Sequence, residues 1–234
     1  MKPFDRPPSL MNLVTEKLRT AIISGDFMLG EQISESNIAG RFGISKTPVR
    51  EALQQLRAEG LVRVVPQTGT FVFTMSAREV IELCELRLTL EQAALDLALR
   101  RDAKGLGKRL TSLVQSMEKV HANGDFRSYL NLDTEFHEQF FHYCGNQYLA
   151  DAYSRIKGQV AALRTHLAGR PEHTQLSLNE HKAMARTIAM GRIVDVPKIL
   201  ADHIARTQTA YAANIVDIAQ ADRTFGAKRT RVTS

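Results

Sequence analysis

Residues 43–60 decide the fold, and they read Gly-Ile-Ser-Lys-Thr-Pro-Val-Arg-Glu-Ala-Leu-Gln-Gln-Leu-Arg-Ala-Glu-Gly. This stretch predicts a tight turn followed by a helix. Gly43 can adopt the positive φ that a sharp turn between helices needs, and Pro48 falls in the first helical turn, where its missing N–H has no partner to lose. Ser45 is a suitable N-cap, so we expect the helix to begin near Lys46.

The predicted helix has two different faces. Apolar residues at positions 49, 53 and 56 recur at helical spacing and are expected to be buried. The opposite face carries cations, amides and a hydroxyl, namely Lys46, Thr47, Arg50, Gln54 and Arg57. Such side chains can contact the phosphates and base edges of DNA, so this helix is a candidate recognition helix.

The surrounding residues complete a small domain, 1–75. Helical spacing predicts an upstream helix over about 10–25 and a second, short helix around Ile38. Two short strands with a turn between them follow the third helix, at 61–65 and 70–73. Three helices and a hairpin make a winged helix-turn-helix, in which the third helix enters the major groove of DNA.

These residues resemble the GntR family of bacterial transcription regulators. The matching segments are Gly30-Glu-Gln-Ile-Ser-Glu35, Phe42-Gly-Ile-Ser-Lys-Thr-Pro-Val-Arg-Glu-Ala-Leu53, Glu59-Gly-Leu61 and Gly69-Thr-Phe-Val72. The resemblance implies double-stranded DNA as the partner. In the family, the positions that match Ser36, Ser45, Lys46, Arg50 and Gly69 commonly lie against DNA. The predicted DNA-binding set also includes Thr47 on the same helix face and the wing-turn residues Gln67 and Thr68.

Two positions depart from the commoner pattern of the family. Lys46 replaces a frequent arginine, which removes a bidentate fork for guanine, and Ser36 stands where some members carry an arginine. The resemblance therefore implies docking in the groove but leaves the base preference open. The alternative interpretation of Lys46, Arg50 and Arg57 is a solvated charged helix face.

Composition places the chain among ordinary globular proteins. It has 234 residues, of which 44% are hydrophobic and 24% charged, and its net charge of +6 is only weak support for a polyanionic partner. Cys84 and Cys144 lack Cys-x-x-Cys spacing and are expected to be buried free thiols in a reducing compartment. The sequence has no recognisable signal peptide and no apolar run of membrane-spanning length, so we expect a cytoplasmic protein with no membrane partner.

From residue 76 onward, helical periodicity replaces strand-like alternation. Ser76 can cap a helix, with Glu79 in the capping-box position. We expect an all-α antiparallel bundle over 76–221, for effector binding and dimerisation, and a disordered basic tail, 222–234. The predicted helices of the bundle are 76–100, 103–122, 126–144, 146–168, 173–191 and 195–217. The fold class is therefore mainly α, with a winged helix-turn-helix followed by a helical bundle.

Inside the bundle, polar residues occupy positions where the helical period calls for apolar ones. Asp133 and His137 lie four residues apart on one such stripe, and an i, i+4 pair can hold one ion. His181 and His203 lie on the apolar stripes of two later helices. One carboxylate and three imidazoles suit Zn²⁺ or another late first-row divalent ion better than Ca²⁺ or Mg²⁺. Taken singly, each histidine is more simply a surface or hydrogen-bonded residue.

The same residues resemble the FCD effector-binding domain of FadR-type GntR regulators, over about 76–217. The segments are Asn131-Leu-Asp-Thr-Glu-Phe-His137, Glu180-His181 and Asp202-His-Ile204. In that domain an Asp-x3-His pair and two later histidines bind a metal in many members. The resemblance implies that zinc, or else nickel or manganese, is bound by Asp133, His137, His181 and His203.

Arg87 lies in the middle of an apolar stripe on the first helix of the bundle. A buried guanidinium needs an anionic partner. Arg87 either forms an ion pair with a carboxylate of the bundle or binds the carboxylate of a small effector beside the metal. In the resembling domain an arginine of this helix, in the motif Glu85-Leu-Arg-Leu-Thr-Leu-Glu91, has the second role. Asn131 and Arg164 are further effector-binding candidates on helical phase alone.

These patterns predict a homodimeric transcription regulator, expected to be a repressor, whose affinity for an inverted-repeat operator is controlled by a small organic acid. It is not expected to be an enzyme. The competing hypothesis is a metal-dependent hydrolase that uses Asp133 and the three histidines, but Glu180 is a poor candidate base and the chain lacks a His-Glu-x-x-His motif. The third hypothesis, a DNA-binding protein without an effector, leaves Arg87 and the four metal ligands without a role.

Overall fold

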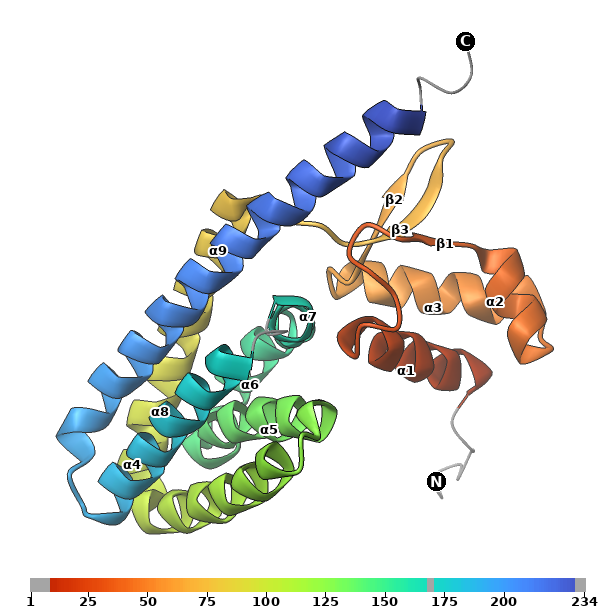
Figure 1. Ribbon diagram of the computed structural model, residues 1–234. Coiled ribbons are helices and arrows are strands. Elements are labelled where there is room, and N and C mark those ends of the chain that lie inside the picture. Colours follow the sequence, from red (N-terminus) through yellow and green to blue (C-terminus); the bar gives the residue numbers. More distant parts are fainter. Residues whose placement is uncertain (1–8, 168–170, 230–234) are drawn as a thin grey trace, which may run out of the picture. The chain divides into compact units, whose positions relative to one another are not determined.

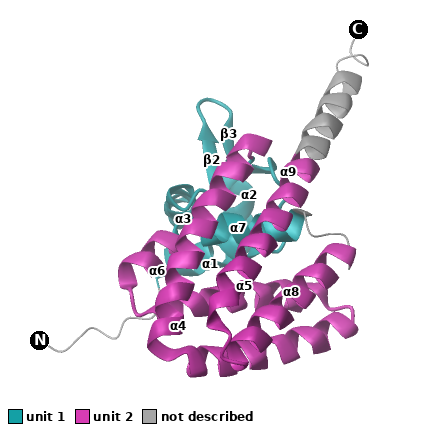
Figure 2. Ribbon diagram, turned by 90° about the vertical axis from the view of Figure 1, so that its left-hand side faces the viewer, with its two compact units in different colours: residues 1–74, 155–166 teal, residues 75–154, 167–234 magenta. Residues whose placement is uncertain are grey.

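The computed structural model describes residues 9–167 and 171–229. The chain forms two compact units, which Figure 2 colours separately. Unit 1 comprises residues 1–74 and 155–166, and unit 2 comprises residues 75–154 and 167–234. No helix in the described part of the chain is long and apolar enough to cross a membrane.

Unit 1 contains the predicted winged helix-turn-helix (Figure 1). Its helices are α1 (Leu10–Ile23), α2 (Glu35–Phe42) and α3 (Lys46–Ala58), and its strands are β1 (Gln32–Ile33), β2 (Val62–Val65) and β3 (Gly69–Val72). The strands form one antiparallel sheet in the order β1-β3-β2, in which β2 and β3 are the predicted hairpin. The sequence does not predict β1, because two residues are too few to show an alternating pattern.

The turn before α3 has the predicted conformation. Gly43 adopts a φ of +64°, in the left-handed region, and α3 begins at Lys46. Ser45 occupies the N-cap position, as predicted, although its side chain makes no capping hydrogen bond within the described chain. The predicted apolar face of α3 is buried. The core of unit 1 contains Ile22, Val49, Leu53, Leu56, Leu61 and Val72.

A helix from far along the sequence also belongs to unit 1. The predicted helix 146–168 is in fact two helices, α6 (Gln147–Ser154) and α7 (Lys157–Leu167), and α7 belongs to unit 1 as far as residue 166. Gln159 on α7 donates a hydrogen bond from Nε2 to the carbonyl of Gly60 at 3.0 Å. The contacts thus place residues 155–166 with the winged domain, whereas the predicted second domain includes them.

Unit 2 is the predicted helical bundle, and the fold class is mainly α as expected. Its other elements are α4 (Ala77–Ala122), α5 (Phe126–Cys144), α8 (Pro171–Ala189), the short 3-10 helix η1 (Ile193–Asp195) and α9 (Val196–Arg229). The predicted helices 76–100 and 103–122 are joined in α4 across a kink at Asp102 (φ −152°, ψ 67°). The capping box is confirmed, because Ser76 Oγ accepts from the Glu79 amide and the Glu79 carboxylate accepts from the Ser76 amide.

The predicted basic tail, 222–234, overlaps the end of α9. Helix α9 extends to Arg229 and so includes residues 222–229. Residues 230–234 lie outside the described residues.

Helix α4 contacts α5, α8 and α9, and the core of unit 2 lies between these helices (Figure 1). Cys84 and Cys144 are buried free thiols, as predicted. The large apolar side chains of this core include Leu95, Leu106, Leu110, Phe136, Phe140, Met184, Leu200 and Tyr211.

Arg87 and Glu91 form an ion pair inside this core. Arg87 Nε donates to Glu91 Oε1 at 2.7 Å, and the two side chains are 1% and 0% exposed. Burial by itself would lower the pKa of Arg87 and raise the pKa of Glu91. Their mutual attraction outweighs burial, so the pKa of Arg87 is raised and the pKa of Glu91 is lowered. The sequence leaves two partners open for Arg87, a carboxylate of the bundle or the carboxylate of an effector. The bundle supplies the first of these, Glu91.

Glu91→Gln should lower the free energy of unfolding by about 3–5 kcal/mol, because it leaves the buried Arg87 guanidinium without a charged partner. Urea unfolding followed by circular dichroism measures this loss. Glu82→Gln is the matched control, since Arg78 and Glu82 form an exposed ion pair at the same i, i+4 spacing on the same helix. The control substitution should change stability little, and equally small effects from both variants would contradict the buried ion pair.

Candidate functional site

The predicted DNA-binding residues are accessible in unit 1. On α3, Lys46, Thr47 and Arg50 are exposed, whereas the apolar residues at positions 49, 53 and 56 are buried. Gly69 in the wing is half-buried. The other members of the set are exposed, namely Ser36, Ser45, Gln67 and Thr68. The polar face that the sequence predicts for α3 is therefore open to a ligand.

A carboxylate of the neighbouring helix orients Arg50. Arg50 Nη2 lies 3.0 Å from Glu35 Oε2, in the first turn of α2, and this hydrogen bond raises the pKa of Arg50. An exposed pair of this kind is weak. Glu35 can therefore position the guanidinium and still be replaced by a phosphate or a base.

The wing turn depends on β1. Gln67 has a φ of +62° and is the one residue other than glycine with positive φ in the described chain. Gln32 on β1 donates from Nε2 to the carbonyl of Thr68 at 3.0 Å. A Cβ at position 69 would lie 2.8 Å from the same Nε2 atom, and Gly69 has a φ of +135°, so glycine is the residue that fits here.

Three histidines from three helices meet in the core of unit 2. His137 on α5, His181 on α8 and His203 on α9 are all buried. A ring nitrogen from each lies within 4.8 Å of the other two, and the Nε2 atoms of His137 and His181 are 3.2 Å apart. The fold thus brings together three of the four predicted metal ligands.

Asp133, the fourth predicted ligand, lies beside these histidines. It is buried one turn before His137 on α5, and its Oδ2 is 3.8 Å from His137 Nε2. Among the described residues, the donor atoms that all lie within 4.8 Å of one another belong to the three histidines, and Asp133 is not part of this group. A shift of the Asp133 side chain is therefore needed before all four residues can share one ion.

Two glutamates fix the histidine rings. Glu91 Oε2 lies 2.8 Å from His137 Nδ1, and Glu180 Oε2 lies 2.6 Å from His203 Nδ1. An ionised carboxylate can only accept, so each Nδ1 carries the proton and each Nε2 of a neutral ring presents its lone pair. Histidines that bind metal ions are commonly supported in this way.

Sequence reasoning missed both supporting roles. The signal for Glu91 was its position four residues after Arg87, and the signal for Glu180 was its place next to His181.

Burial favours the neutral form of the His137 and His203 rings. Burial lowers the pKa of His137 to about 4 and also lowers the pKa of His203, although Glu91 and Glu180 act in the opposite direction. Burial would raise the pKa of Glu180, but hydrogen bonds from Arg206 and His203 bring it down to about 2. Because metal ions bind the neutral form of imidazole, this shift favours metal binding by His137 and His203.

The donor set fits a late first-row divalent ion. Two imidazole nitrogens on one tetrahedral zinc ion, each about 2.0–2.1 Å from it, are about 3.3 Å apart. The Nε2 atoms of His137 and His181 are separated by 3.2 Å. Nitrogen donors with one nearby carboxylate also match the preference of zinc and its neighbours over calcium.

Arg87 reaches the same cluster from α4. Its Nη2 lies 3.1 Å from His137 Nε2. Glu91, the other partner of Arg87, also accepts a hydrogen bond from the hydroxyl of Tyr153 on α6 at 3.3 Å. Asn131 is exposed on α5, and Arg164 is buried on α7 in unit 1. The structure therefore brings Arg87 into the buried cluster, whereas Asn131 is open to solvent.

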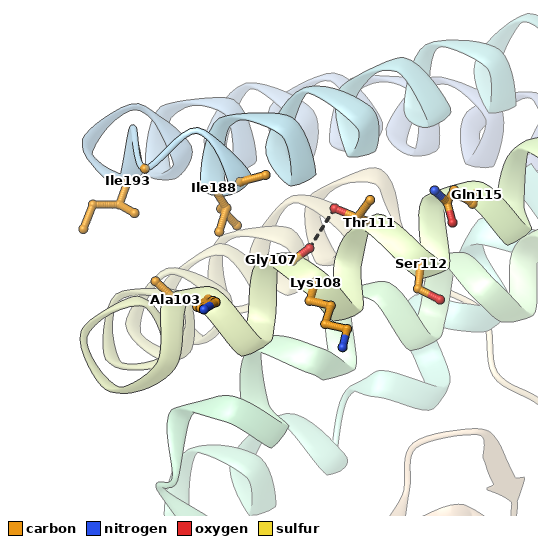
Figure 3. A pocket seen from close by; sticks show the side chains of 11 residues that line it. Ala103, Gly107, Lys108, Thr111, Ser112, Gln115, Ile188 and Ile193 are labelled. Atoms are coloured by element: carbon orange, nitrogen blue, oxygen red, sulfur yellow. Dashed lines mark hydrogen bonds between the residues drawn. The ribbon is translucent and has the colours of Figure 1, made fainter.

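A hollow of about 650 Å³ lies elsewhere in unit 2 (Figure 3). It is lined by the second half of α4 and the end of α8, including Gly107, Thr111 and Ile188. The predicted metal and effector residues lie outside this hollow.

Comparison with known proteins covers both parts of the chain. The model of the FCD domain matches residues 82–206, and the model of bacterial regulatory proteins of the gntR family matches residues 10–72. The gluconate operon transcriptional repressor of Bacillus subtilis is 26% identical over 180 residues, which cover 75% of this chain and 74% of that protein. The transcriptional repressor GlaR of Escherichia coli is 30% identical over 152 residues, 63% of this chain and 69% of that protein.

The solved structure of McbR/YncC from E. coli has the same fold, with a TM-score of 0.77 at 20% identity over 89% of this chain and 99% of that one. The gntR match spans α1 to β3, and the FCD match begins on α4 and ends on α9. The families and the named relatives are transcriptional regulators and not enzymes. The chain therefore belongs to the GntR family of bacterial regulatory proteins, carries an FCD domain behind its winged helix-turn-helix, and is a DNA-binding transcription regulator.

Proposed function

We propose that this regulator is a homodimeric repressor that acts in the cytoplasm and loses or gains operator affinity when a small carboxylate binds beside a metal ion in unit 2. The observation that carries the proposal is the contact of Arg87 with His137 inside a cluster of three buried histidines. A guanidinium and a metal ion are both strong partners for carboxylate oxygens. Repression is proposed because two of the related proteins are named as repressors.

The proposed metal ligands are Asp133, His137, His181 and His203. Zinc is the first candidate, because imidazole nitrogens with one carboxylate suit it. Nickel and manganese are alternatives, since metal availability and site geometry decide among ions that bind imidazole. The ion would supply positive charge and coordination positions for effector oxygens. Arg87 is the proposed effector-binding cation, and Asn131 and Arg164 stay predictions.

The proposed DNA complex places α3 in the major groove and the wing turn against the backbone. A two-fold symmetric dimer presents two such helices, so an inverted repeat is the proposed operator. The proposed contacts are Ser36, Ser45, Lys46, Thr47, Arg50, Gln67, Thr68 and Gly69, all of them exposed except the half-buried glycine.

The environment of Glu180 argues against the competing metallohydrolase. Its carboxylate is engaged by His203 and by Arg206, which donates from Nε at 2.7 Å, and its pKa of about 2 makes it a weak base. A DNA-binding protein without an effector would leave three buried, converging histidines without a ligand.

Arg50→Ala should weaken operator binding by about 5- to 150-fold at fixed salt, because it removes an exposed guanidinium from the start of the recognition helix. Fluorescence anisotropy with a labelled operator measures the change. Arg78→Ala is the control: Arg78 is an exposed arginine on α4, so this variant loses the same charge and should bind the operator as the wild type does. Unchanged operator affinity in a folded Arg50→Ala protein would remove Arg50 from the proposed DNA contacts.

His181→Ala should abolish zinc binding, because it removes one of three convergent imidazoles from the buried cluster. Protein that has been treated with a chelator, reconstituted with Zn²⁺ and desalted should carry about one ion per chain in the wild type and much less in the variant, as measured by elemental analysis. His142→Ala is the matched control, since His142 is exposed on the same helix as His137. Full zinc content in the His181→Ala protein would exclude His181 as a ligand.

A further inference from the structure

The Nε2 atom of His137 has a single lone pair. The Nδ1 proton of this ring is directed to Glu91, so Nε2 is the acceptor nitrogen. Arg87 has only donors, and its Nη2 lies 3.1 Å from this acceptor. The same Nε2 lies 3.2 Å from His181 Nε2, which is the separation expected of two nitrogens on one ion. A hydrogen bond from Arg87 and a bond to a metal ion would use the same electron pair.

The guanidinium of Arg87 is only partly satisfied in its present position. Nε is paired with Glu91 at 2.7 Å and Nη2 with His137. Nη1 is buried and has no acceptor among the described residues. A buried donor of this kind has hydrogen-bonding capacity left for a further acceptor.

We propose that Arg87 and the metal ion compete for Nε2 of His137, so that metal binding releases Nη2 of Arg87 and makes it available to an anionic ligand. This inference rests on the proposed metal site and specifies how that site is regulated. The ion pair with Glu91 keeps Arg87 in the cluster after release, because it uses Nε and does not involve His137. The guanidinium needs only to turn its outer nitrogens away from His137.

The charges of the cluster favour this order of binding. Arg87 and Glu91 form an ion pair whose charges cancel. A divalent ion makes the sum positive, and a carboxylate then balances it. The released donors of Arg87 also need an acceptor, which the same carboxylate provides. The anionic effector should therefore bind the metal-loaded protein in preference to the metal-free protein.

The test is the zinc affinity of Arg87→Met, measured by competition with a chromophoric chelator and with no effector present. Methionine keeps the apolar stem but cannot donate a hydrogen bond to His137. If Arg87 competes with the ion, the variant should bind Zn²⁺ at least about tenfold more tightly than the wild type. If Arg87 only supports the site, the variant should bind with equal or lower affinity, and either result would overturn the proposal.

Arg206→Met separates competition from a general effect of charge. Arg206 is a cation of the same unit that bonds to Glu180, which in turn supports His203. If removal of a nearby positive charge were sufficient, loss of Arg206 should also tighten zinc binding. We expect no comparable tightening in Arg206→Met, and equal tightening in both variants would reject the competition.

A second pair of variants covers the case in which Arg87→Met does not fold. Glu91→Gln and Arg87→Met/Glu91→Gln both retain an acceptor for His137 Nδ1, namely the side-chain carbonyl of the glutamine. The double variant also avoids the buried, unpaired carboxylate that Arg87→Met alone would leave at position 91. Removal of Arg87 from the Glu91→Gln background should again tighten zinc binding, and an unchanged or weaker affinity there counts against the proposal.

The outcomes also distinguish this inference from the proposed function. A wild-type protein that binds no Zn²⁺ would reject the metal site, and the competition with it. Tightening in Arg87→Met, combined with an operator affinity that no organic acid changes, would reject the effector while supporting the competition.

Discussion

The orientation of one imidazole is the constraint on which the rest of unit 2 depends. His137 is held through Nδ1 by Glu91, and Glu91 is held in turn by Arg87 and Tyr153. These groups come from α4, α5 and α6, and all are buried, so the hydrogen-bond partners that they have come from inside the protein. The polar cluster therefore fixes how three helices meet, and a change at any one member is felt by the others.

The cluster lies partly on the helix that follows the wing in the sequence. Helix α4 carries Arg87 and Glu91, and its capping box at Ser76 follows β3 of the wing after only a few residues. Under the proposed function, a ligand that moved α4 against α5, α8 and α9 would act on the helix to which the winged domain is directly connected. Such a ligand can change operator affinity only by the difference in its affinity for two arrangements of the protein.

Much of this architecture can be predicted from the sequence because local chemistry determines it. Gly43 and Pro48 predict the turn and the start of α3, and Ser76 with Glu79 predicts the start of α4. The three histidines can be predicted because each interrupts an apolar stripe. The break between α6 and α7 has no glycine or proline to mark it, and the assignment of α7 to unit 1 depends on tertiary contacts. The roles of Glu91 and Glu180 depend on partners tens of residues away, so spacing alone cannot identify them.

The most direct test of the proposed metal site is anomalous diffraction at the zinc edge from crystals of the zinc-loaded protein. We expect one strong peak per chain, about 2.0–2.1 Å from the Nε2 atoms of His137, His181 and His203. We also expect that Arg87 no longer lies within hydrogen-bonding distance of His137 Nε2. A peak elsewhere in the molecule, or a bound ion with Arg87 still bonded to His137, would contradict the proposed site.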